Sequence, residues 1–154
     1  MPDQNIAVVK RIFEGLNSGN LGVLDEFVDP QLVDHSTLRA PKTGAEGLKQ
    51  RLAGFVHAFP DLEFRIHTIF GADDMVTLIW SLRGTHENQF LTIPPTGKRV
   101  HITGINVERL TGGKLVEHWS IPDNIALFEQ LGVLRPLARL PVSSSEPADI
   151  RPGD

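Results

Sequence analysis

Three polar residues have the spacing of neighbours on one face of a β-hairpin. If residues 111–113 form a three-residue turn with Gly113 in the left-handed conformation, Asn106 lies opposite His118. Because side chains alternate between the two faces of a strand, Asn106, His118 and Ser120 then point the same way. His118 is the acid–base candidate of this set, since histidine titrates near neutral pH. A two-residue turn would invert the grouping.

The same register places small and apolar residues beside this polar set. Leu110 pairs with Lys114, and Ile102, Gly104 and Val116 share the face. A glycine inside a strand leaves room for a ligand or marks a bulge. The amide and the hydroxyl of the polar set can hold a carbonyl oxygen or a water, but neither is a strong base. The plainer alternatives are a half-buried structural histidine and ordinary polar residues of a sheet.

Three more titratable residues are candidates for acid–base chemistry. Asp123 precedes a predicted helix, so it is either an N-cap or a pocket carboxylate that desolvation would make basic. Asp34 and His35 lie where the helices give way to the sheet, and a carboxylate beside an imidazole suits proton transfer. Neighbours on an extended segment point opposite ways, however, and two surface loop residues are the alternative.

Aromatic residues could form the walls of a pocket for a flat ligand. The set comprises Trp80, Phe59, Phe90, Trp119 and Phe55, for which membership of the hydrophobic core is the alternative. The chain has 8 Phe and 2 Trp but no Tyr, which excludes tyrosine as a general acid. Most of the aromatic surface therefore has no polar group of its own.

The composition describes one ordinary domain and removes several classes of chemistry. The chain has 154 residues, 40% of them hydrophobic, and a formal net charge of −4, so we expect no nucleic-acid or membrane partner. The absence of cysteine removes disulfides and thiolate chemistry. The six histidines lack the spacing of a zinc site, and no nucleotide-binding or nucleophile-elbow motif is present. We therefore expect no bound metal or organic cofactor.

The hydropathy of the chain shows no membrane span and no export signal. The longest apolar runs are shorter than a transmembrane helix, and residues 1–10 lack the apolar stretch of a signal peptide. The sequence therefore predicts a cytoplasmic protein.

Apolar periodicity predicts helices first and strands afterwards. The expected helices cover residues 5–16, 21–28 and 45–59, the expected strands cover 62–69, 75–84, 99–110 and 114–121, and a last helix covers 124–131. This order is typical of the α+β class, here a curved, cone-shaped antiparallel or mixed sheet with the N-terminal helices on its concave face, enclosing a pocket. We expect residues 1–135 to form this domain and residues 136–154 to be an arm or a disordered tail.

Several short motifs resemble, in order, those of one enzyme family. They are Asp29-Pro30 with Val33-Asp34-His35, Ile93-Pro-Pro-Thr-Gly-Lys-Arg-Val100, Gly104-Ile105, Gly113-Lys-Leu-Val-Glu-His-Trp119, Pro122-Asp123 and Gln130-Leu131-Gly132. Over residues 4–135 the chain resembles the SnoaL-like polyketide cyclases, and residues 32–38 resemble the anthracycline-pathway members. The resemblance implies the nuclear transport factor 2-like α+β cone, a homodimer or homotetramer, and action without a metal or organic cofactor.

The resemblance also implies where the family's proton-transfer residues would lie. The best-understood members close the last ring of an anthracycline precursor by intramolecular aldol condensation, with a histidine and an aspartate. Matched through the hairpin, these two fall on Asn106 and Ser120. Because general-base help contributes about 10²–10⁴-fold, an aldol cyclase would rarely lose both.

These departures favour the branch of the family that assists hydroxylation of an anthracycline ring. A reduced, electron-rich polyketide would react with dioxygen itself, while the protein orients it and moves protons. The proton-handling candidates are His118, Asp123, Asp34 and His35. The implied partners are an aromatic polyketide substrate and a separate reductase that uses NADPH, which this chain would not bind.

Three other functions stay open at this point. A cyclase could use Asp123, His118 or His35 in place of the missing base, and a non-catalytic polyketide binder would need none of them. An epoxide-hydrolase-type site would need carboxylates and an arginine together, but Glu108 and Arg109 fall on opposite sides of their strand.

Overall fold

The structure is a computed structural model that describes residues 1–36 and 43–135. The helices are α1 (Pro2–Asn17), α2 (Gly22–Phe27), α3 (Gly44–Ala58) and α4 (Asn124–Leu131), and the strands are β1 (Val28–Asp34), β2 (Glu63–Ala72), β3 (Met75–Thr85), β4 (Arg99–Thr111) and β5 (Lys114–Pro122). The expected tail, residues 136–154, and the last two residues of the 32–38 segment lie outside the described residues.

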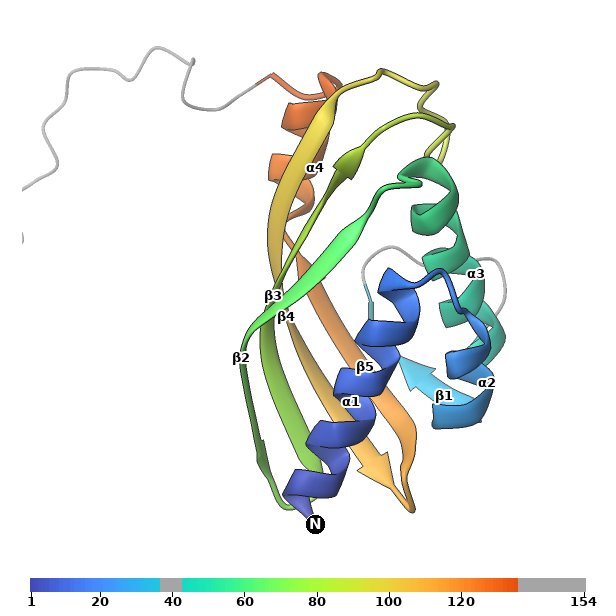
Figure 1. The fold of residues 1–154 in the computed structure, drawn as a ribbon, viewed down its shortest axis with the longest axis vertical. Coiled ribbons are helices and arrows are strands. Elements are labelled where there is room, and N and C mark those ends of the chain that lie inside the picture. Colours follow the sequence, from blue (N-terminus) through green and yellow to red (C-terminus); the bar gives the residue numbers. More distant parts are fainter. Residues whose placement is uncertain (37–42, 136–154) are drawn as a thin grey trace, which may run out of the picture.

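The fold is of the α+β class, as the sequence predicts. Five strands form one open, mixed sheet in the order β1-β5-β4-β3-β2. The sheet curves, and α1, α2 and α3 lie on its concave side, whereas α4 lies against the far end of β4 (Figure 1). Helix α1 buries Val9, Ile12, Phe13 and Leu16 at helical spacing, which is the stripe that its sequence predicts.

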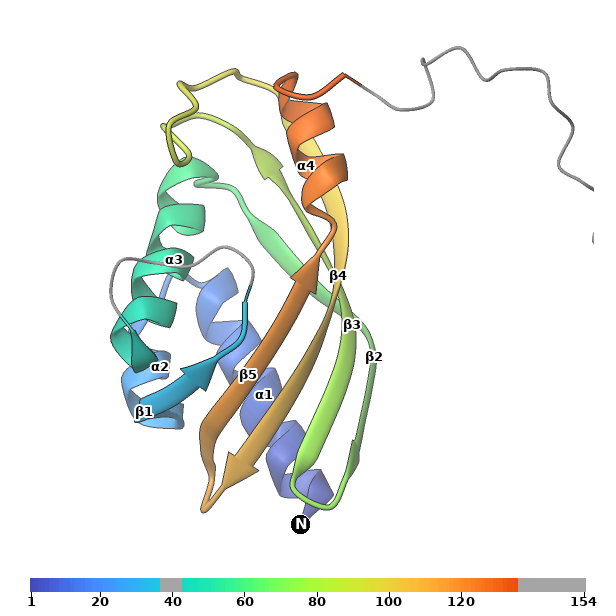
Figure 2. The ribbon, with the colours of Figure 1, turned by 180° about the vertical axis from the view of Figure 1, so that it is seen from behind.

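Strand β1 is the one regular element that the sequence analysis misses. It pairs in parallel with β5 and occupies an edge of the sheet (Figure 2). Pro30 lies inside it, and proline normally argues against a strand because it cannot donate a ladder hydrogen bond. An edge strand tolerates the loss on its unpaired side. The predicted second helix consequently ends at Phe27, and Val28 belongs to the sheet.

The β4–β5 hairpin has a two-residue turn, not the three-residue turn expected. Gly112 and Gly113 both have positive φ, 58° and 76°, as a two-residue hairpin turn requires. Thr111 therefore pairs with Lys114, and the predicted pairing of Leu110 with Lys114 is wrong.

A register shift next to the turn restores the predicted face. It lies between Arg109 and Leu110, and beyond it Asn106 pairs with Ser120 and Glu108 with His118. A two-residue turn alone would invert the faces, but the extra residue of a bulge inverts them back. Asn106, His118 and Ser120 thus share one face as predicted, although the pairing of Asn106 with His118 is wrong. Leu115, not Val116, is the buried residue beside them.

Gly104 makes room for a side chain of the neighbouring strand, not for a ligand. It pairs with Trp80 of β3, and any Cβ at this position would overlap the six-membered ring of the indole. The absence of a side chain at Gly104 therefore lets Trp80 lie flat across β4. The register runs unbroken through this pair, so Gly104 does not mark a bulge.

The outer face of the sheet exposes a row of isoleucines. Ile79, Ile105 and Ile121 are strand partners on β3, β4 and β5, and each is at least 40% exposed. A contiguous apolar row of this kind marks an interaction surface more often than a solvated one. Within the described residues, no helix is long and apolar enough to cross a membrane.

Replacing Gly104 with alanine should destabilise the protein by about 1–3 kcal/mol, because the new methyl group forces Trp80 out of its rotamer. Urea unfolding measures this. Gly54→Ala is the matched control: Gly54 lies in α3, and a methyl group added there would meet nothing within 4 Å, so alanine should stabilise by about 0.5–1 kcal/mol. Equal effects of the two substitutions would contradict the packing of Trp80 against Gly104.

Candidate active site

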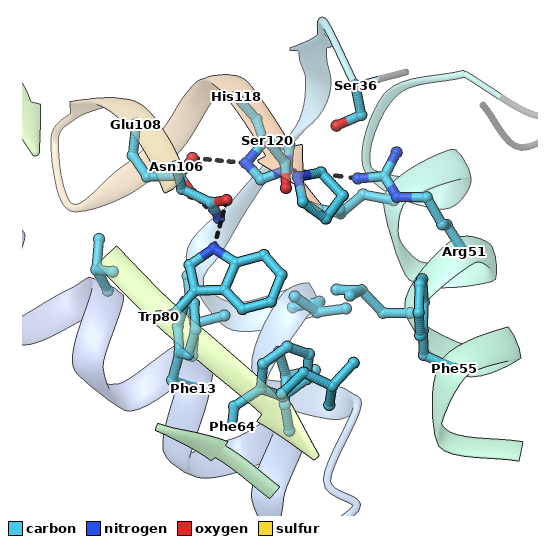
Figure 3. Close-up of a pocket in the computed structure, with 18 of the residues that line it drawn as sticks. Phe13, Ser36, Arg51, Phe55, Phe64, Trp80, Asn106, Glu108, His118 and Ser120 are labelled. Atoms are coloured by element: carbon cyan, nitrogen blue, oxygen red, sulfur yellow. Dashed lines mark hydrogen bonds and ion pairs between the residues drawn. The ribbon is translucent and has the colours of Figure 1, made fainter. Parts of the chain in front are cut away.

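A pocket lies between the concave face of the sheet and helices α1 and α3. The empty space at this pocket is about 850 Å³ when the open solvent at its mouth is included. Most of its wall is apolar, with Phe13, Phe55, Phe64 and Trp80 as the aromatic members (Figure 3). The polar residues of the wall are Ser36, Arg51, Asn106, Glu108, His118 and Ser120. The polar set predicted on the hairpin therefore faces a pocket.

A chain of hydrogen bonds runs through the buried end of this pocket. The Trp80 indole donates to Asn106 Oδ1 over 2.8 Å, and Asn106 Nδ2 donates to Glu108 Oε1 over 3.0 Å. Glu108 Oε2 lies 2.7 Å from His118 Nδ1. The Glu108 and His118 side chains are only 4% and 8% exposed, so this pair is removed from water. Figure 3 shows the Trp80–Asn106 and Glu108–His118 links.

One cationic and one anionic side chain, Arg51 and Asp34, continue the series of hydrogen bonds on the other side of His118. Arg51 of α3 places Nη2 at 3.3 Å from His118 Nε2 and donates through Nη1 to Asp34 Oδ2 over 2.7 Å. Asp34 Oδ1 in turn accepts from the backbone N–H of Ser36 over 2.9 Å. Residues from α3, β1, β4 and β5 thus meet at one histidine.

The partners of His118 indicate which of its nitrogens donates and which accepts. Arginine can only donate, so His118 Nε2 accepts from Arg51, and the ring proton lies on Nδ1, where it is donated to Glu108. The Asn106 amide has its oxygen on Trp80 and its nitrogen on Glu108, so both oxygens of Glu108 are acceptors. In this arrangement Glu108 accepts at both oxygens, and His118 donates through Nδ1 and accepts at Nε2.

Asp34 is held in its charged form. Burial works against the charge, but hydrogen bonds from Ser36 and the Arg51 guanidinium outweigh it, and the pKa of Asp34 lies below its ordinary value of 3.8. Asp34 is consequently a poor base at neutral pH. Its carboxylate orients Arg51 instead.

This arrangement can accept and return a proton. A carboxylate on Nδ1 orients a histidine and stabilises the imidazolium that forms when Nε2 takes a proton. The guanidinium beside Nε2 can stabilise negative charge that develops on a ligand oxygen. The site is therefore suited to proton abstraction next to a carbonyl group.

The other acid–base candidates lie outside this arrangement. Asp123 is the N-cap of α4 and accepts from the backbone N–H of Ala126 over 3.0 Å. His35 lies on the opposite side of β1 from Asp34, stacks on Trp119 at 4.7 Å and pairs with Glu117. Asp123, His35 and Trp119 are not among the described pocket-lining residues.

The predicted aromatic wall is shared between pocket and core. Trp80 lines the pocket, as expected, and so does Phe55. Phe59 and Phe90 are buried behind Phe55, with ring centroids 6.4 and 4.9 Å from it, and are core residues among those described. Phe13 and Phe64, which the sequence analysis did not single out for the pocket, complete the wall.

Sequence reasoning missed three polar residues of the site. Glu108 is two residues from Asn106 in a strand, so alternation alone would have placed it on the same face. Arg51 interrupts the apolar stripe of α3 at one turn from both Leu48 and Phe55, which was a usable signal. Ser36 had no such signal in the sequence, because nothing in its neighbourhood predicts that β1 ends at the pocket.

The part of the chain that the structure describes contains no cluster of metal ligands. No group of three or more His, Cys, Asp or Glu side chains there could hold a metal ion. The Glu108 and Arg109 side chains lie on opposite faces of β4, as predicted, and Arg109 pairs with Asp74 and Glu117 outside the pocket.

Comparison with known proteins identifies the family. Residues 6–131 match the family of SnoaL-like polyketide cyclases, which is most of the chain. The chain belongs to this family. Among its curated relatives is the aklanonic acid methyl ester cyclase DauD of Streptomyces sp. (strain C5), 27% identical over 135 residues that cover 82% of this chain and 81% of the relative.

Solved structures of the family have the same fold. AclR of Streptomyces galilaeus, named as a candidate hydroxylase, superposes with a TM-score of 0.78 at 26% identity, covering 87% of this chain and 99% of its own. IdmH of Streptomyces antibioticus, named as a candidate polyketide cyclase, gives 0.74 at 32% identity, covering 84% and 99%. The resemblance to anthracycline-pathway members is thus confirmed.

Substituting Asp34 with asparagine should lower stability at neutral pH and have no effect in strong acid. A carboxyl whose folded pKa is depressed contributes stability above its ordinary value of 3.8 and loses it as the pH falls through the folded pKa. Urea unfolding of the wild type and Asp34→Asn at a series of pH values from 7 downwards measures this. A difference that stays constant over the series would show that the Arg51 pairing does not depend on the charge.

Proposed function

We propose that the protein catalyses intramolecular aldol ring closure of an aromatic polyketide ester, with His118 as the base. The observation that carries this proposal is the buried Glu108–His118 pair in an aromatic-walled pocket, 2.7 Å between carboxylate oxygen and imidazole nitrogen. The curated relative DauD is a methyl ester cyclase, which supports the same class of reaction.

The proposed step is an isomerisation that needs only proton transfer. When the carbonyl oxygen of the ligand takes over the Arg51 donor, His118 Nε2 removes a proton from the carbon next to that carbonyl group, and the electron pair of the broken C–H bond forms an enolate. The enolate carbon attacks a second carbonyl carbon of the same molecule and forms the new ring bond. The resulting alkoxide takes the proton back from His118. The guanidinium of Arg51 is placed to stabilise the enolate oxygen.

The proposed acid–base pair lies on the hairpin next to the two positions that the resemblance gives to the family's histidine and aspartate. The resemblance puts the family's histidine and aspartate at positions 106 and 120, which are strand partners here. Glu108 and His118 are the next partners on the same face. The loss of a base at Asn106 and Ser120, which favoured hydroxylation when only the sequence was considered, is therefore compensated within the same pocket.

Hydroxylation is the second candidate, and the similarity to AclR supports it. In that reaction dioxygen supplies one oxygen atom to a reduced ring and the other leaves as water, with two electrons from NADPH delivered by a separate reductase. Asn106 and Ser120 would hold the ring oxygens.

The expected assembly into a homodimer or homotetramer also stays a prediction, for which the exposed row of Ile79, Ile105 and Ile121 is the surface to test.

Oxygen dependence separates the two reactions. Aklanonic acid methyl ester, the substrate named for DauD, should give a ring-closed product of unchanged mass, at the same rate under nitrogen as in air. Mass spectrometry after incubation under ¹⁸O₂ detects the alternative. A product that is heavier by one labelled oxygen, formed with a reductase and NADPH and absent under nitrogen, would overturn the cyclase proposal. Tight binding with neither product would favour a non-catalytic binder.

His118→Gln should lower kcat for ring closure by about 10²–10⁴-fold, because glutamine cannot carry the proton. Circular dichroism and thermal unfolding check that the fold is kept. His67→Gln is the control: His67 bonds Ser81 on the outer face of the sheet, so kcat should stay within twofold of the wild type. If both variants retain full activity, His118 is not the base.

A further inference from the structure

The pocket contains a buried serine hydroxyl, that of Ser36, with no hydrogen-bond partner among the described residues. Ser36 is only 4% exposed, and its Oγ meets no group there with hydrogen-bond geometry. Its hydroxyl is near enough to Asp34 to help lower the pKa of that carboxyl, but it is not bonded to it. Ser120 lines the same pocket from β5. A buried hydroxyl without a partner is costly, and ligand binding can supply the partner.

The Asp34 carboxylate holds the Ser36 backbone and the Arg51 side chain near each other. One carboxylate, that of Asp34, accepts from the Ser36 N–H over 2.9 Å and from Arg51 Nη1 over 2.7 Å. Ser36 and Arg51 are therefore held together by a common partner at the pocket wall. Figure 3 shows the Ser36 hydroxyl on the side of the pocket where Arg51, Ser120 and His118 converge.

The charge and polarity of this corner select the group that it would bind. Arg51 is a donor only, and both hydroxyls can donate, so the three groups suit an acceptor such as a carbonyl oxygen. The rest of the wall is aromatic and aliphatic, which suits the flat hydrocarbon frame of a ligand. A carbonyl oxygen bound to Arg51 in this corner would lie next to His118, because Arg51 contacts His118 Nε2.

We propose that Ser36, Ser120 and Arg51 form a subsite for the oxygen of a planar aromatic ketone, with Asp34 as the residue that positions Ser36 and Arg51. This inference rests on the proposed function for its biological meaning, because it names the carbonyl that acidifies the proton removed by His118. Binding of a ketone to the subsite does not itself need turnover. Asp34, a catalytic candidate in the sequence, takes a positioning role here.

The test compares two probes that differ in one oxygen. 9-Fluorenone is a planar tricyclic ketone, and fluorene has the same ring frame with a CH₂ group in place of the carbonyl. Fluorescence titration gives the Kd of each probe for the full chain, and the ratio of the two values isolates the contribution of the oxygen. The infrared stretch of the bound fluorenone carbonyl reports its hydrogen bonds independently.

Removing each hydroxyl should weaken the ketone alone. Ser36→Ala and Ser120→Ala should each raise the Kd of fluorenone by about threefold to tenfold, the effect of one hydrogen bond, and leave the Kd of fluorene within twofold. The carbonyl stretch should move to higher frequency in both variants. Ser81→Ala is the matched control, because that hydroxyl bonds His67 on the outer face. It should leave the ratio and the stretch unchanged.

Several outcomes overturn the inference. It fails if Ser36→Ala leaves the fluorenone-to-fluorene ratio unchanged, if it weakens both probes equally, or if wild-type protein does not bind fluorenone at its solubility limit. The proposed function fails separately. His118→Gln should keep the wild-type ratio while ring closure is lost, so a protein that binds fluorenone through its serines but closes no ring would retain this subsite and lose the proposed activity.

Discussion

The need to satisfy one buried carboxylate organises the polar half of the pocket. Glu108 faces the interior of an apolar cone, where an unpaired charge would cost several kcal/mol. Asn106 and His118 donate to its two oxygens, and Trp80 and Arg51 hold those donors in the orientation that allows it. Each residue in this series of hydrogen bonds therefore has a defined role as donor or acceptor. The result is a histidine at the pocket wall that is held between Glu108 on Nδ1 and Arg51 on Nε2.

The curved sheet makes this arrangement possible. Its concave face presents alternate residues of β4 and β5 to one space, and α3 closes that space from the other side. The helix contributes both apolar side chains and Arg51, which pairs with Asp34 and lies against His118. Trp80 can reach Asn106 because Gly104, between β3 and β5, has no side chain. Packing and electrostatics are therefore coupled at a few positions.

The sequence predicted most elements because their signals are local. The stripe of α1, the N-cap at Asp123 and the alternation in β4 each depend on residues within a few positions of one another. Strand β1 was missed because Pro30 is evidence against a strand until the neighbouring strands show that it is at an edge. The hairpin turn was predicted one residue too long, and its face survived only because a bulge added the residue back.

Residue types and alternation alone determined that the chain has an α+β fold with polar side chains of one hairpin on a common face. They also indicated His118 as the group to titrate. The sequence could not decide what His118 contacts, because Arg51 and Asp34 are 67 and 17 positions away from their partners in the chain. Those contacts depend on how α3 and β1 pack against the sheet, and no short segment of the sequence encodes that packing. Only the tertiary structure therefore turned a polar face into an acid–base site.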